Sequence, residues 1–137
     1  MLFMIMVKAT AESDAGEMPD EELLDAMQRF HEELYEAGML MEATGLQTSA
    51  AGWRIRYDGE RQEFIEGPFD EPNRVIAGYT IIRADSREQA LEWTRRFPNP
   101  ASGKGRGEIE VRRLMEVQDE LPSDAPALFR QMDVDFR

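Results

Sequence analysis

The chain has 137 residues, of which 42% are hydrophobic, and it contains no cysteine. This length is most simply one domain, and the missing cysteines exclude disulfide bonds and thiolate metal sites. The formal net charge of −12 disfavours nucleic acids and anionic membrane surfaces as partners, because both are themselves negatively charged. The simplest interpretation of the acidity is solubility, and the alternative is a surface for a basic protein partner.

The opening residues, 1–8, are apolar and are predicted to form a strand rather than a signal peptide. No basic region precedes them, and no clear cleavage site follows them. Elsewhere no run approaches the ~20 apolar residues that span a bilayer. We therefore expect a cytoplasmic protein without membrane contact.

The first predicted strand, residues 2–8, has two apolar faces. Alternation places Leu2, Met4, Met6 and Lys8 on one face and Phe3, Ile5 and Val7 on the other. Because both faces are apolar, both need cover. A layer of helices covers one, and a partner subunit is the simplest cover for the other.

A helix is predicted from Pro19 to a stop at Gly38, after a loop over residues 9–18. Its apolar residues recur at helical spacing and form one stripe: Leu23, Leu24, Met27, Phe30 and Leu34. His31 is the single histidine of the chain. At 100° per residue it falls within about 40° of Met27, so its ring is expected to face the sheet.

The middle of the chain predicts a second strand over residues 39–42, followed after a small-residue loop by a β-hairpin. The hairpin arms are residues 53–57 and 62–66, with Asp58-Gly59 at the turn. An Asp-Gly pair between two such runs is a good turn signal. The register stays open, since the next two residues fit either the turn or the second arm.

Three elements are predicted after the hairpin. Residues 75–82 form the strongest strand, whose β-branched content favours a central position. Ser86 has N-cap character for a second helix that ends by Pro98. Residues 108–114 alternate as a last strand, and residues 119–137 form an acidic tail that either frays or docks through its few apolar residues.

This order, β-α-β, hairpin, β-α-β, predicts an α+β fold of the ferredoxin-like kind, with an antiparallel sheet. Right-handed crossovers place both helices on the same face of the sheet. The other face is left bare, and two such sheets packed about a twofold axis would cover it. We therefore expect a homodimer.

A short motif, Glu66-Gly67-Pro68-Phe69-Asp70-Glu71, resembles the DGPF signature of the YCII-related family. Other stretches fall at the places that the resemblance predicts: Lys8-Ala9-Thr10, Glu32-Glu33-Leu34, Ala37-Gly38, Thr44-Gly45-Leu46, Ala77-Gly78-Tyr79, Gln89-Ala90-Leu91-Glu92-Trp93, Pro98-Asn99-Pro100 and Glu108-Ile109-Glu110-Val111-Arg112. Two departures matter. Glu66 replaces the leading aspartate, and His31 lies about one turn later than the helix-1 histidine of the YciI-like branch, so that histidine's role is not carried over.

The resemblance implies a domain over residues 1–118 with a ferredoxin-like fold and a dimeric α+β barrel-type assembly. Dimeric barrels related to the family include isomerases, dehydrochlorinases and monooxygenases that act on small cyclic compounds. Many DGPF-type proteins resemble products encoded beside extracytoplasmic-function sigma factors. Because a shared fold does not carry function, these activities enter only as expectations.

Three residues are candidate acid–base groups, namely His31, Glu66 and Asp70. His31 either serves as a general base in a cleft between helix and sheet, or is a packed and hydrogen-bonded histidine at the edge of the stripe. The two carboxylates either cap backbone donors in their turn or project into the same cleft.

Four further residues are candidate binding groups: Lys8, Arg54, Glu71 and Tyr79. Lys8 could anchor a carboxylate or phenolate, or simply extend from a strand end into water. Arg54, like Arg56, is expected to pair with Glu63 or its neighbours across the hairpin. Glu71 belongs to the turn motif, and Tyr79 offers a phenol beside Gly78, which marks a bulge or a close approach.

The expected function is that of a cofactor-independent enzyme that performs isomerase- or lyase-like proton transfer on a small cyclic compound. The alternative is a non-catalytic module that binds a metabolite and reports to a protein partner such as a sigma factor. A purely structural dimer is the third interpretation. No nucleotide, phosphate, nucleophile-elbow or HExxH motif is present, so we expect no cofactor and no metal.

Overall fold

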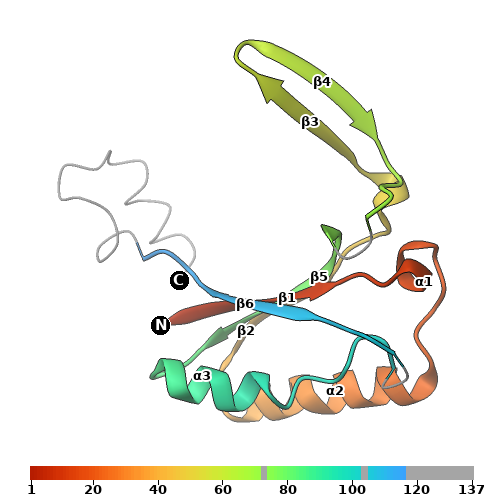
Figure 1. Cartoon of the computed structure of the whole chain (residues 1–137). Helices are drawn as coiled ribbons and strands as arrows, with labels where there is room; N and C mark the ends of the chain where they lie inside the picture. The colour runs from red at the N-terminus through yellow and green to blue at the C-terminus, as the bar shows by residue number, and fades with distance from the viewer. Residues whose placement is uncertain (72–73, 103–104, 117–137) are drawn as a thin grey trace, which may run out of the picture.

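The computed structural model describes residues 1–71, 74–102 and 105–116 (Figure 1). The predicted tail, residues 119–137, lies outside these ranges. The elements run in the order β1 (Leu2–Lys8), α1 (Ala11–Asp14), α2 (Glu21–Glu36), β2 (Leu40–Gly45), the 3-10 helix η1 (Ser49–Ala51), β3 (Trp53–Asp58), β4 (Arg61–Glu66), β5 (Ile76–Arg83), α3 (Arg87–Thr94) and β6 (Ile109–Arg113).

Four strands form one sheet in the order β2-β5-β1-β6, and every neighbouring pair is antiparallel. Helices α2 and α3 lie on the same side of this sheet (Figure 1). Strands β3 and β4 form a separate two-stranded sheet on its other side. The mixed α+β class and the antiparallel sheet are therefore as predicted.

The register of β1 confirms that its two apolar faces differ in what covers them. Phe3 lies opposite Ile82 in β5 and belongs with it to the core cluster under the helices. Met4 lies opposite Ile81 and therefore points to the other face of the sheet. Among the residues that the structure describes, no helix lies over that second face (Figure 1).

The hydrophobic core lies between the sheet and the two helices. Its buried members are Phe3, Ile5, Phe30, Leu34, Met39, Ile82, Ala84 and Ala90. Trp93 and Phe97, in and after α3, pack against this cluster. Each fully buried large apolar side chain stabilises the fold by about 1.5–3 kcal/mol, so this layer holds α2 against the sheet.

Helix α2 begins two residues later than predicted. Asp20 is its N-cap, so Pro19 lies before the helix, and the Asp20 carboxylate accepts the Leu23 N–H at 2.9 Å. A carboxylate satisfies an orphan N–H of the first turn, which proline cannot do. The predicted stop at Gly38 is confirmed, since this residue has a φ of 72°.

A short helix, α1, occupies part of the stretch predicted as a loop. Thr10 and Ser13 form a reciprocal capping box around it. The prediction was wrong here because Ser13 takes the place of the glutamate or glutamine that usually marks this motif.

The register of the hairpin corrects one predicted ion pair. Arg56, not Arg54, lies opposite Glu63, and Arg61 belongs to the second strand. Arg54 instead reaches Glu71, beyond the hairpin, with its Nη1 3.4 Å from the carboxylate. The sequence could not show this contact, because the turn after the hairpin folds back beside β3.

No helix in the described part of the chain is both long and apolar enough to cross a membrane.

Candidate functional site

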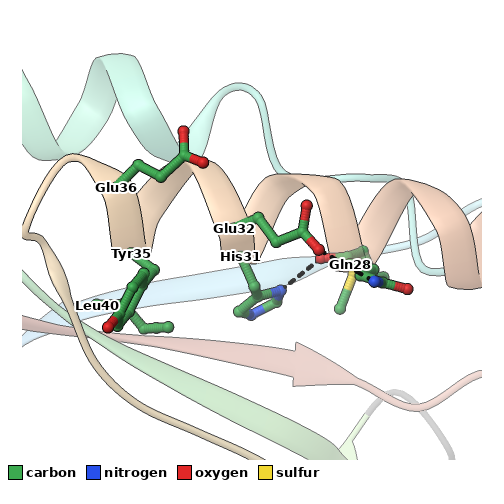
Figure 2. Close-up of a pocket in the computed structure, with 7 residues that line it drawn as sticks. Gln28, His31, Glu32, Tyr35, Glu36 and Leu40 are labelled. Atoms are coloured by element: carbon green, nitrogen blue, oxygen red, sulfur yellow. Dashed lines mark hydrogen bonds between the residues drawn. The ribbon is translucent and has the colours of Figure 1, made fainter.

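His31 bridges helix α2 and the central strand β5. Its Nδ1 lies 2.7 Å from the carbonyl oxygen of Met27, one turn earlier (Figure 2). Its Nε2 lies 2.8 Å from the hydroxyl oxygen of Thr80. Because a carbonyl only accepts, Nδ1 carries the proton in the neutral ring, and Nε2 accepts from the Thr80 hydroxyl. The prediction that His31 faces the sheet is confirmed.

Aromatic rings fix the plane of the imidazole. Phe30 meets the His31 ring edge-on at a centroid distance of 5.6 Å, and Phe97 does so at 6.2 Å. Thr80 is only 2% exposed, whereas His31 is half-buried. The imidazole is therefore held in one orientation while one part of it stays accessible.

Two cavities meet at His31. An open groove of about 460 Å³ lies along α2 and is lined by Met27, Gln28, His31, Glu32, Tyr35, Glu36 and Leu40. A second cavity, of about 290 Å³, is lined by His31, Thr80, Tyr79, Val7, Ala43 and other residues of β2 and β5. Figure 2 shows the rings of His31 and Tyr35 turned toward the sheet and the Glu36 carboxylate turned away from it. We call these two cavities together the His31 groove.

The His31–Thr80 pair can carry a proton without losing a hydrogen bond. When the imidazole is neutral, the Thr80 hydroxyl donates to Nε2. When it is protonated, Nε2–H donates and the hydroxyl oxygen accepts, because a hydroxyl serves either role. Nδ1 stays bonded to the Met27 carbonyl in both states. This adaptable pairing is what an acid–base residue requires.

The ring tautomer gives a first testable prediction. In a protein labelled with ¹⁵N-histidine, the single imidazole should show a protonated Nδ1 and an unprotonated Nε2 at alkaline pH. Thr80→Val, of nearly the same shape, removes the partner of Nε2 only and should leave the Nδ1 proton in place. A spectrum with the proton on Nε2 would contradict the hydrogen-bonding scheme.

The structure does not bring Glu66 or Asp70 to His31. Glu66 ends β4, and Asp70 is an exposed residue of the turn that follows. Neither cavity at His31 includes either carboxylate. The predicted partnership of these three residues is therefore not seen in the described chain.

The turn motif is anchored to the loop before β3. The Gly67 N–H donates to the Gly52 carbonyl at 2.9 Å. The Arg54 guanidinium lies 3.8 Å from the centre of the Phe69 ring and also pairs with Glu71. Arg54 and Glu71 thus brace the turn, and the backbone of Gly67 lies close to that of Ser49.

Ser49 ties this turn to α1. Its N–H and hydroxyl both donate to the Asp14 carboxylate, at 2.7 and 2.6 Å. The Ser49 hydroxyl oxygen in turn accepts the Phe69 N–H at 3.0 Å. A buried serine with these partners fixes α1, η1 and the turn as one unit.

Lys8 and Tyr79 lie on the sheet face away from the helices. Lys8 pairs with Glu110 of β6 at 3.3 Å, and the Tyr79 hydroxyl donates to Glu42 at 3.0 Å. The ammonium group of Lys8 and the hydroxyl group of Tyr79 therefore lie across the sheet from His31, although Tyr79 is also among the residues that line the smaller cavity.

A pH prediction follows from this cluster. Hydrogen bonds from Arg112 and then Lys8 hold the pKa of Glu110 below its ordinary value of 4.5. A carboxyl group with a lowered folded-state pKa stabilises the fold above the unfolded-state pKa, and that contribution is lost as pH falls through the folded value. Arg112→Gln should move the Glu110 titration, followed by ¹³C NMR, toward its ordinary range. An unchanged titration would contradict this cause.

No group of three or more histidine or acidic side chains in the described residues is placed to hold a metal ion.

Sequence reasoning missed Thr80, Ser49 and Asp14. Thr80 had a signal, because it is a hydroxyl at a helix-facing position of the strongest predicted strand. For Ser49 and Asp14 the sequence carries no such signal, since nothing in the small-residue loop before the hairpin or in residues 9–18 indicates that these two segments contact each other.

Two comparisons place the chain among known proteins. The family model of the YCII-related domain matches residues 1–118. An uncharacterised protein of Rhizobium meliloti (strain 1021) is 28% identical over 105 residues, which cover 76% of this chain and 83% of that relative.

Proposed function

The chain belongs to the YCII-related domain family, and we propose that it binds a small, mainly apolar compound in the His31 groove and exchanges a proton with it. The observation that carries this proposal is the placement of His31, which lines both cavities and whose Nε2 is bonded to an adaptable hydroxyl.

The lining supports this class of ligand. Apolar side chains such as Met27, Leu40 and Val7 form part of the walls, polar side chains of α2 such as Gln28 and Glu32 line the outer part, and His31 lines both cavities. Small-molecule sites have this composition, with a few polar groups that orient the ligand in an apolar cleft. A small cyclic compound with one carbonyl or hydroxyl group fits this description.

The proton moves as a relay. The Thr80 oxygen takes a proton from a carbon or oxygen of the ligand while its own hydroxyl proton passes to Nε2 of His31. The reverse transfer to a different atom of the ligand completes an isomerisation, and loss of a leaving group after the first transfer would give a lyase. The Met27 carbonyl holds the ring in the tautomer that can accept this proton.

A second candidate is binding without chemistry. In this case the Thr80–His31 pair only recognises the ligand, and the exposed acidic face of α2, with Asp25, Glu33 and Glu36, meets a basic protein partner. A regulatory partner such as a sigma factor belongs to this alternative.

The assembly is part of the proposal. The strand order and the two helices on one face support a ferredoxin-like arrangement. The uncovered face supports a homodimer, because a twofold axis would bury the same surface on both copies.

The test is a thermal-shift screen with small carboxylates, lactones, phenols and quinols. Ligand at 100 times its dissociation constant should add about 2.7 kcal/mol, a shift of several degrees. Hits are then incubated in D₂O, and exchange of carbon-bound hydrogen is followed by NMR.

Three variants separate the two candidates. His31→Gln keeps a polar group near Nε2 and should retain part of the binding while losing all exchange. Glu22→Gln, at an exposed residue in the first turn of α2 that lines neither cavity, should behave like the wild type. If the wild type binds a ligand but exchanges none of its carbon-bound hydrogen, the second candidate, binding without chemistry, is favoured. If a ligand raises the melting temperature of His31→Ala as much as that of the wild type, the site lies elsewhere.

A further inference from the structure

The hairpin of β3 and β4, residues 53–66, is an arm that stands apart from the rest of the fold (Figure 1). Each of its strands has only the other as a ladder partner among the described residues. A two-stranded hairpin by itself is marginally stable in water. The arm therefore needs a further surface against which to pack.

One face of the arm is apolar and exposed. Trp53, Ile55 and Tyr57 alternate along β3, and Phe64 lies opposite Ile55. Their exposed fractions are 62, 43, 68 and 60% in chain order. The rings of Trp53 and Phe64 are 6.4 Å apart, so the face is continuous. We call these four residues the apolar arm face.

The four-stranded sheet has a matching surface on the side away from the helices. Met4, Met6, Tyr79 and Ile81 lie side by side at its centre, as the register of β1 and β5 shows, and all but the buried Ile81 are partly exposed. Charged residues surround them, and three of these are joined in the Lys8–Glu110–Arg112 cluster. An apolar centre with a polar rim is the usual organisation of a protein interface. We call this surface the open sheet face.

We propose that two copies of this chain exchange arms, so that the apolar arm face of each copy packs on the open sheet face of the other. This inference rests on the proposed homodimer and identifies the segment that holds it together. Figure 1 shows the arm rising on the same side of the sheet as the open face, where a second copy would approach.

The area available is enough for a stable dimer. Three aromatic side chains of roughly 200 Å² each, about two-thirds exposed, together with Ile55 offer about 500 Å² per arm. Two arms then contribute about 1,000 Å² of their own, and the partly exposed Met4, Met6 and Tyr79 side chains of each sheet add to the buried area. Stable interfaces bury about 1,200–2,000 Å² in total, so arm exchange reaches the lower end of this range.

Charge and anchoring also favour a second copy. The whole chain carries a net charge of −12, but the arm has three arginines against four carboxylates. A nearly neutral arm approaches another acidic copy without the repulsion that two acidic helices would meet. The Gly67–Gly52 hydrogen bond and the Arg54–Glu71 pair fix the base of the arm, which favours exchange over collapse onto its own sheet.

The test is sedimentation velocity of the full chain at micromolar concentration. The wild type should be a dimer, and the double variant Trp53→Glu/Phe64→Glu should raise the dissociation constant at least 100-fold, since two buried aromatic anchors are lost. The control is Arg56→Gln/Glu63→Gln, a cross-strand pair on the opposite face of the arm, which should remain dimeric. Circular dichroism checks that each variant folds.

A second measurement does not depend on the folding of the charged variant. Acrylamide quenching of the wild type, compared with Trp53→Phe, reports the accessibility of Trp53, and arm exchange predicts that this residue is protected. A double variant that folds and stays dimeric would overturn arm exchange but leave the homodimer. A monomeric wild type with accessible Trp53 would overturn both, and it would leave the arm for a different protein. Neither result bears on ligand binding at His31.

Discussion

Replacing Gly67 by alanine is expected to lower the free energy of unfolding by about 3 kcal/mol. A Cβ at this position would stand 1.8 Å from the carbonyl oxygen of Ser49 and 2.7 Å from its carbonyl carbon. Both are backbone atoms, so no side-chain rotation relieves the clash. The turn would have to move, and the hydrogen bonds from Gly67 to Gly52 and from Phe69 to Ser49 would be lost or weakened.

Gly52→Ala is the matched control, because Gly52 is the acceptor residue of the same hydrogen bond. The nearest atom to its added Cβ is 3.7 Å away, an ordinary contact, and its φ of −118° suits any residue. Its unfolding free energy, measured in urea, should change by no more than about 0.5 kcal/mol. Equal effects in the two variants would mean that the turn does not pack against Ser49 as described.

Phe30→Ala is expected to cost about 3–5 kcal/mol, the range for truncating a buried aromatic ring. Phe30 is buried, and the centroid of its ring lies 5.2 Å from the ring centroid of Phe97 and 6.4 Å from that of Trp93. It also supports the His31 ring edge-on. The variant should therefore lose stability and lose the fixed orientation of the imidazole, which urea unfolding and ¹⁵N-histidine spectra measure separately.

Tyr35→Ala on the same helix is the control for stability. Tyr35 is 74% exposed, so its loss should change the unfolding free energy by no more than about 0.5 kcal/mol. Phe30→Leu keeps most of the volume and should lose much less stability than Phe30→Ala. A small loss in Phe30→Ala would contradict the position of this ring in the core.

Local pattern predicted the parts of the fold that depend on periodicity. The alternation of β1 assigned Phe3 and Met4 to opposite faces, and the helical stripe turned His31 toward the sheet. These predictions succeeded because a strand or helix repeats its geometry at every residue. The hairpin turn at Gly59 followed from its Asp-Gly pair for the same local reason.

Contacts between distant segments could not be predicted in this way. Thr80 is 49 positions from His31, and nothing in either segment specifies that they meet. Nothing in the motif around Gly67 specifies that its backbone lies against that of Ser49. The pairing of Arg54 with Glu71 depends on how the chain leaves β4. Such contacts are set by the packing of whole elements.

The most direct test of the proposed site is the ¹⁵N spectrum of the single histidine as the small carboxylates, lactones, phenols and quinols are added one by one. Binding in the His31 groove predicts that at least one of these compounds shifts the ring-nitrogen signals, in a saturable way, while the protein stays folded. If compounds that raise the melting temperature leave both ring nitrogens unchanged, the ligand binds elsewhere and the central claim is wrong.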